Sequence, residues 1–163
     1  MKSINDIAND IDKYVILSAH LELTCKYLSI GVVASLMYNF RDALTHYVRL
    51  YEAGTSEDEV SQKASIDEHL SRGLKDTCFS IIDEMINRIL DAFKNTTKIQ
   101  ETCFRKQLHV FKEMEIKLRK NTKMKDINSF SLFKDELTKS IIDTKNIFQS
   151  YNVPFKSNAN YQL

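Results

Sequence analysis

Apolar residues recur along most of the chain with the three- and four-residue spacing of amphipathic helices, and five such segments can be distinguished. The first begins at Ser3, whose hydroxyl can cap a helix, and a break is expected at 29–31. The second ends at Gly54, a residue type expected just beyond a helix end. Its apolar face is expected to pack into the core and comprises Val33, Met37, Phe40, Leu44, Tyr47 and Tyr51.

The third segment is predicted to run from Ser56, with Glu59 completing a capping box, to about Lys94. It is polar in its first half and strongly apolar in its second half. A fourth helix is predicted after 95–97 and a fifth after 128–129. Short loops between long amphipathic helices favour antiparallel neighbours. The predicted fold is therefore all-α, an up-and-down bundle of four to five long antiparallel helices.

The composition agrees with a single helical domain. The 163 residues include only three Gly and one Pro, so long helices need not be interrupted. A bundle domain is expected over 1–152, followed by an irregular tail over 153–163. No apolar run is long enough for a membrane span or a signal peptide, and three widely spaced Cys suggest reduced thiols. A cytoplasmic protein without a membrane partner is expected.

Basic residues cluster at and beyond the end of the fourth predicted helix. A net charge of +1 argues against a globally basic nucleic-acid binder but permits such a local patch. The patch could contact nucleic acid or an acidic partner. Alternatively, the positive charges only complement the helix dipole. The residues are Lys117, Arg119, Lys120, Lys123 and Lys125.

One short element in the second helix has residues suited to catalysis. It reads Arg41-Asp42-Ala43-Leu44-Thr45-His46. Arg41 and His46 lie about 140° apart around a helix, whereas Asp42 shares a face with His46 and could orient its imidazole. The alternative is a solvated surface cluster of Asp42, His46 and Arg49.

This element resembles the R-x4-6-H signature of HEPN domains, small helical bundles that are often ribonucleases. The resemblance covers the short element and the all-helical character of the chain. It implies a homodimer that cleaves RNA without a metal, at a site shared by two protomers, where the RNA 2′-hydroxyl attacks its own phosphate. His46 would be the general acid or base, and Arg41 would stabilise the charge on the phosphate. A role as a toxin or an antiviral defence effector is implied by the resemblance alone.

A second polar stripe lies on the third helix, where its members share one face. If the second and third helices form a hairpin turning near Thr55, Arg41 lies opposite His69. The element from Arg41 to His46 and the polar stripe of the third helix would then form a phosphate-binding or catalytic groove. The alternative is an ion-pair network, Arg41 with Glu68 and Arg72 with Asp76, that fixes helix register. The stripe consists of Ser65, His69, Arg72 and Asp76.

No group of residues has usable metal-ligand spacing, and no phosphate-binding loop or nucleophile motif is present, so no metal and no cofactor are expected. Three functional hypotheses follow. The first is a HEPN-like RNA-acting protein. The second is a non-enzymatic helical interaction or regulatory module that binds a protein partner through the polar half of the second and third helices. The third is a binder of a nucleotide-type ligand that does not cleave it.

Overall fold

The described residues of the protein fold into five α-helices. The computed structural model describes residues 3–31, 34–53, 55–94, 97–120, 127–158 and 160–163. Among these residues there is no β-strand, which confirms the predicted all-α up-and-down bundle. Val33, Gly54, Asn95, Thr96, Lys123 and Lys125, which entered the predictions above, lie outside the described residues. The helices are α1 (Ile4–Tyr27), α2 (Ala34–Glu52), α3 (Ser56–Phe93), α4 (Lys98–Lys120) and α5 (Ile127–Ser150).

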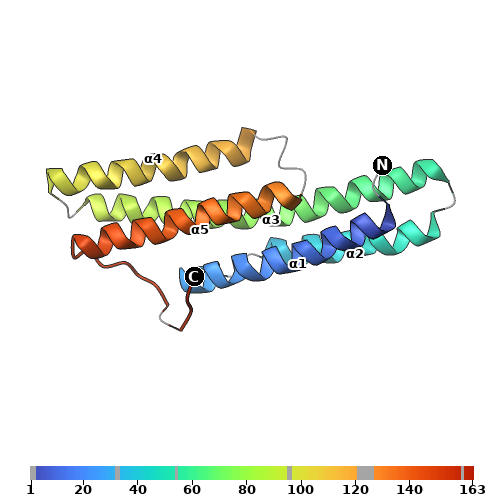
Figure 1. Cartoon of the computed structure of the whole chain (residues 1–163), viewed down its shortest axis with the longest axis horizontal. Helices are drawn as coiled ribbons and strands as arrows, with labels where there is room; N and C mark the ends of the chain where they lie inside the picture. The colour runs from blue at the N-terminus through green and yellow to red at the C-terminus, as the bar shows by residue number, and fades with distance from the viewer. Residues whose placement is uncertain (1–2, 32–33, 54, 95–96, 121–126, 159) are drawn as a thin grey trace.

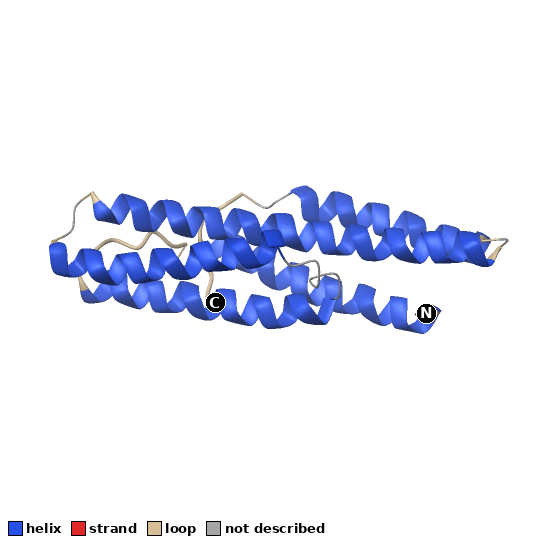
Figure 2. Ribbon diagram, turned by 90° about the horizontal axis from the view of Figure 1, so that it is seen from above, coloured by secondary structure: helices blue, strands red, loops and turns tan. Residues whose placement is uncertain are grey.

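The bundle is elongated and organised around α3 (Figures 1 and 2). With 38 residues, α3 is the longest helix and spans about 57 Å at 1.5 Å per residue. α2 returns along the N-terminal half of α3, and α4 and α5 lie beside its C-terminal half. α1 contacts both α3 and α5. No helix in the described part of the chain has both the length and the apolar character that a membrane crossing requires.

Local capping explains both ends of α1. The Ser3 side chain accepts from the Asp6 amide at 3.1 Å, and the Asp6 carboxylate accepts from the Ser3 amide at 2.8 Å, which confirms the predicted N-terminal cap. At the other end Ser29 adopts φ 57°, and the Ile30 amide donates to the Cys25 carbonyl at 2.8 Å. A left-handed residue with this hydrogen bond is a common way for a helix to stop. The predicted break is therefore confirmed.

The cap of α3 lies one residue before the predicted one. The hydroxyl of Thr55, not that of Ser56, accepts from the backbone amide of Asp58, at 3.1 Å. Both hydroxyl residues suit this role, so sequence pattern alone does not distinguish them. The predicted pairing of Ser56 with Glu59 is wrong.

α2 buries a different face from the predicted one. Met37 and Tyr51 are 66% and 64% exposed, and Leu44 is 38% exposed. Phe40 and Tyr47 from the predicted face are half-buried at its edge. The residues that α2 buries are Leu36, Asn39, Ala43 and Leu50. The prediction failed because α2 carries two apolar stripes, and periodicity does not say which one is covered.

Close packing at Gly73 of α3 helps to select the buried face. A Cβ atom at Gly73 would lie 2.6 Å from the Tyr14 hydroxyl and 3.2 Å from the Asn39 Cβ. The Tyr14 hydroxyl, buried beneath α2, donates to the Leu36 carbonyl at 2.9 Å. The Tyr14 ring stacks on Phe40, with centroids 5.4 Å apart. Burial raises the pKa of Tyr14 well above its ordinary value, so the donating hydroxyl stays protonated.

Candidate functional site

The predicted hairpin of α2 and α3 forms, with a register two positions from the predicted one. His69 contacts Asn39, with 3.3 Å between the His69 Nδ1 and Asn39 Oδ1. Two helical turns further, His46 Nδ1 lies 2.7 Å from Gln62 Oε1. The prediction placed Arg41 opposite His69, because it estimated the length of the turn near Thr55 without knowing how the helix ends pack.

The two helices bring His46 and His69 together. Their half-buried imidazole rings stack with centroids 5.3 Å apart and an interplanar angle of 21°. An amide oxygen only accepts hydrogen bonds, so each Nδ1 donates to its Asn or Gln partner. In the neutral rings the proton therefore lies on Nδ1, and each Nε2 keeps its lone pair. The predicted hairpin brought the polar clusters of both helices together, but with Arg41 rather than His46 beside His69.

A polar chain continues from His69 through α2 and back to α3. The Asn39 amide nitrogen donates to the Ser35 carbonyl at 2.9 Å, which fixes its oxygen toward His69. Asn39 also donates to the Ser35 hydroxyl at 2.8 Å, and that hydroxyl donates to the Asp76 carboxylate. Asn39 is only 8% exposed, so this network holds α2 against α3 within the interior. His69 and Asp76, predicted to share a polar stripe, are thus linked through two residues of the opposite helix.

Arg41 lies on the outer side of α2. Its side chain is 69% exposed, and its Nε and Nη2 donate to the Asp42 carboxylate at 3.0 and 2.8 Å. The guanidinium also lies 5.5 Å from the centre of the Tyr38 ring. Hydrogen bonding from Arg41 holds the pKa of Asp42 below its usual range, and the charges of Arg41, His69 and His46 act in the same direction.

The predicted catalytic pair does not converge within one protomer. His46 faces α3 and Gln62, whereas Arg41 is directed to Asp42 and Tyr38. The Asp42 carboxylate, which was predicted to orient the His46 ring, accepts from Arg41. This divergence follows from the angle of about 140° between positions 41 and 46 around a helix.

The predicted register-fixing ion pairs are replaced by others. Arg72 pairs with Glu68 one turn earlier on α3, and both side chains are more than half exposed. Asp76 accepts from Ser35 of α2, and Arg41 pairs with its neighbour Asp42. Exposed pairs of this kind contribute little to stability. The register therefore depends on the buried amide and hydroxyl network rather than on the predicted ion pairs.

A shallow groove runs along α3 beside the polar network. Its volume is about 640 Å³, and Glu68, Arg72 and Asp76 line it together with Lys75 and Phe79. Its lining includes both acidic and basic side chains, so no single charge dominates. The groove contains three residues of the predicted site, whereas Arg41, His46 and His69 do not line it.

Two residues in the described part of the basic patch already form ion pairs. Lys117 donates to the Glu136 carboxylate of α5 at 2.7 Å. Arg119 pairs with Glu115 at 2.7 Å and lies 5.1 Å from the centre of the Phe79 ring. Lys120 is exposed, and Lys123 lies outside the described residues. The paired side chains brace α4 against α5 and α3.

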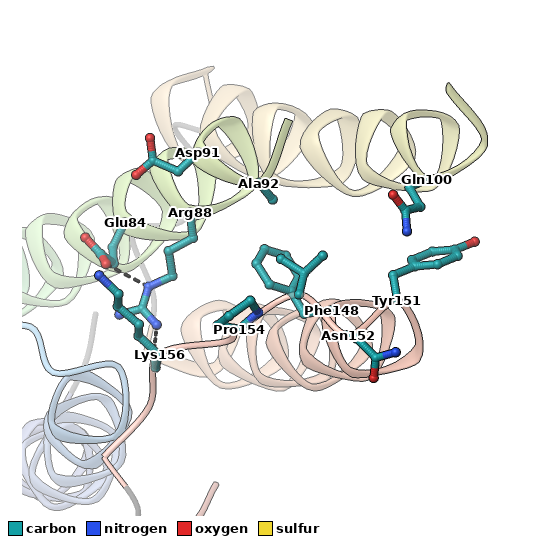
Figure 3. A pocket seen from close by; sticks show the side chains of 11 residues that line it. Glu84, Arg88, Asp91, Ala92, Gln100, Phe148, Tyr151, Asn152, Pro154 and Lys156 are labelled. Atoms are coloured by element: carbon teal, nitrogen blue, oxygen red, sulfur yellow. Dashed lines mark hydrogen bonds and ion pairs between the residues drawn. The ribbon is translucent and has the colours of Figure 1, made fainter. Parts of the chain in front are cut away.

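A second hollow, of about 450 Å³, lies between α3, α4 and the residues that follow α5 (Figure 3). Arg88 borders it and donates through Nε to Glu84 at 2.7 Å. The other two guanidinium nitrogens donate to the backbone carbonyls of Leu28 and Lys156. Phe155 lies over this guanidinium at 5.4 Å.

The chain after α5 has no regular secondary structure over 153–158, but it is anchored to the bundle. Asn158 donates from its amide to the Tyr27 carbonyl at 2.7 Å, and the C-terminus lies beside the end of α1 (Figure 1). Because every nitrogen of the Arg88 guanidinium already has a partner, we assign this region a structural role.

No group of three or more His, Cys, Asp or Glu residues within the described ranges is arranged to hold a metal ion. The thiols of Cys25 and Cys78 are buried. The Cys103 sulfur lies 3.1 Å from the Tyr151 hydroxyl oxygen.

The most distinctive surface feature is an apolar stripe on the outer side of α2. Its large side chains are strongly exposed: Met37 by 66%, Val48 by 58% and Tyr51 by 64%. We define the outer stripe of α2 as Met37, Arg41, Leu44, Val48 and Tyr51. Scattered exposed apolar residues are normal, but a contiguous set on one helix face is typical of an interaction site.

Comparisons with protein-family models, with curated proteins and with solved structures found no match to this chain. The resemblance to HEPN domains stays a prediction carried by the element from Arg41 to His46.

Proposed function

We propose that this chain is a helical interaction module that binds a helical protein partner through the outer stripe of α2. The observation that carries the proposal is the exposure of Met37, Val48 and Tyr51 on one face of a helix whose opposite face is buried. An amphipathic partner helix laid along such a stripe removes its apolar surface from water.

The buried polar network supports this proposal because it gives the histidine cluster a structural role. Asn39, Ser35 and Asp76 connect α2 to α3 through side chains that the bundle covers at least in part. A satisfied network of this kind fixes one register between two helices. It therefore holds the outer stripe in a single orientation toward solvent.

The test uses a photoreactive benzoylphenylalanine in place of Tyr51. Irradiation of the purified protein, alone and in an extract of cells that produce it, should give a discrete adduct. The adduct should disappear when Val48→Glu is added, because a charge on the stripe opposes burial. Leu132 on α5 is 75% exposed and supplies the matched control position. Absence of an adduct from position 51, or equal adducts from both positions, would overturn the proposal.

A second candidate function is HEPN-like action on RNA, with the toxin or defence role that the resemblance implies. The observation that favours it is the exposed Arg41 guanidinium on α2, the helix whose His46 ring stacks on the His69 ring of α3. A second protomer would have to complete the site, since Arg41 and His46 face different ways within one chain. This candidate competes with the first for Arg41, which belongs to the outer stripe.

The candidates are separated by an RNA cleavage assay without divalent metal. Ribonuclease action requires products with 2′,3′-cyclic phosphate ends, lost in both His46→Ala and Arg41→Ala while the helical circular dichroism spectrum is retained. If varied RNAs remain intact with a folded protein, the second candidate fails and the interaction module is unaffected.

A further inference from the structure

We propose that the outer stripe of α2 binds the same stripe of a second copy of this chain, with the two helices antiparallel. This inference rests on the proposed function, because it names the partner that the stripe accepts.

The spacing of the stripe is that of a coiled-coil seam. Positions 37, 41, 44, 48 and 51 follow one another in steps of four, three, four and three residues. This is the alternation of a and d positions in a heptad, and it keeps one seam facing a partner helix along its length. The stripe covers 15 residues, and its ends lie about 21 Å apart along the helix axis, all of it within α2.

The part of the stripe from Arg41 to Tyr51 is complementary to itself when one copy is reversed, and Met37 lies beyond its paired layers. In an antiparallel pair each a position faces a d position, so Leu44 meets Val48 of the second copy on both sides of the two-fold axis. The next layer outward brings Arg41 over Tyr51 of the second copy. Arg41 already lies over an aromatic ring within its own chain, that of Tyr38 at 5.5 Å. A guanidinium over an aromatic face is a favourable contact when it is partly desolvated.

Charge selects the antiparallel arrangement over the parallel one. Glu52 follows Tyr51 and is exposed, so its carboxylate lies close to Arg41 of the second copy when the helices are reversed. A parallel pair in register would place Arg41 against Arg41 of the second copy. Like charges across an interface are unfavourable, whereas the Arg41–Glu52 pair is complementary.

The area of the stripe sets the expected affinity. A stable interface buries about 800 Å² on each partner. A single helix face of this length is smaller, so we expect a dissociation constant on the order of 1–100 μM. Association should therefore depend on concentration across this range.

Sedimentation equilibrium of the full chain tests whether the partner is a second copy. The wild type should dimerise in the micromolar range, and Val48→Glu should weaken association at least about tenfold. Leu132→Glu, at an even more exposed position on α5, should leave association unchanged. Circular dichroism checks that both variants fold. A wild type that stays monomeric at millimolar concentration, or equal weakening by both variants, would overturn the inference.

Charge reversal tests the orientation. Arg41→Glu alone and Glu52→Arg alone should each weaken the dimer, because each places like charges together. The double variant Arg41→Glu/Glu52→Arg should dimerise as the wild type does, since the pair is restored with reversed sign. In a parallel dimer the double variant would dimerise no more tightly than the single variants, and that result would overturn the antiparallel arrangement.

These outcomes can be told apart from failure of the proposed function. If the purified chain is monomeric but the photoreactive group at position 51 still gives a Val48-dependent adduct of another mass in the extract, the interaction module stands. In that case the inference of a second copy is wrong.

Discussion

The Tyr14 hydroxyl of α1 occupies the space that a side chain at Gly73 of α3 would need, since a Cβ there would lie 2.6 Å away. Gly73→Ala should therefore force α1, α2 or both to shift. We expect the free energy of unfolding to fall by about 1–3 kcal/mol, the usual effect of overpacking. Urea denaturation, monitored by circular dichroism, measures this fall in the free energy of unfolding. Gly31→Ala is the control, because no atom lies within 4 Å of the added Cβ.

The same contact predicts coupling between the two positions. Tyr14→Phe alone should cost about 1 kcal/mol through loss of the hydrogen bond to the Leu36 carbonyl. In the Gly73→Ala background the same change removes the clashing oxygen, so it should cost less or be stabilising. Additive effects in this double-mutant cycle would show that the hydroxyl is not what excludes a side chain at Gly73.

The buried amide of Asn39 should matter more for stability than the exposed guanidinium of Arg41, two residues away. Asn39→Ala removes the partners of Ser35 and His69, and we expect a loss of about 1–3 kcal/mol. Arg41→Ala removes an exposed pair with Asp42 and a contact with the exposed Tyr38 ring, and it should change the free energy of unfolding by at most about 0.5 kcal/mol. Chemical denaturation of the two variants compares them. Equal losses would contradict the structural role assigned to the network.

Two of the three thiols should be unreactive in the native protein. Burial raises the pKa of Cys25 to about 11 and that of Cys78 to about 12. Thiolates are the reactive species, so Ellman's reagent at pH 8 should modify only the half-buried Cys103 until the chain unfolds. Cys103→Ser should abolish the fast reaction. Rapid native reaction of a second thiol would mean that the α1–α3 contact opens readily.

The raised thiol pKa values also predict a loss of stability in alkali. An unfolded thiol ionises near pH 9, whereas the folded Cys25 retains its proton to about pH 11. Between these values the unfolded chain binds fewer protons, so the free energy of unfolding falls as pH rises, and it is unaffected below pH 9. The loss should be on the order of 1 kcal/mol by pH 10. It should be smaller in Cys25→Ala, as measured by urea denaturation at each pH.

Arg88 should control how firmly the C-terminal residues are held. Arg88→Lys keeps a positive charge near Glu84 but cannot donate to Leu28 and Lys156 at the same time. Loss of one such hydrogen bond should raise the population of the locally opened state about tenfold. Trypsin should therefore release 157–163 about tenfold faster, as followed by mass spectrometry. Arg105→Lys is the control. Arg105 pairs with Glu101 on the exposed side of α4, so this substitution should leave the rate of release unchanged.

Local signals in the sequence were sufficient for the helices, but not for their contacts. The cap at Ser3 and the break at 29–31 depend on neighbouring residues, and both were predicted correctly. The buried face of α2 was not, because its two apolar stripes are similar in strength and the choice depends on Gly73, which lies on another helix.

The polar site shows the same division between local and long-range information. The prediction considered titratable residues, and it placed His69 opposite Arg41. The side chains that contact the two histidines are the amides of Asn39 and Gln62, which carry no charge and match no motif. Their roles come from the register of the hairpin, and that register was predicted with an error of two positions.

The length of α3 has a consequence for how the molecule unfolds. α2 packs mainly on the first half of α3, whereas α4 and α5 pack on the second half (Figure 1). Detachment of α2 would expose the N-terminal half of α3 to solvent, while α4 and α5 would still cover its C-terminal half. Amide protons in the two halves of a single helix should then exchange with solvent at different rates, so that one continuous element contains a boundary between two units of cooperativity.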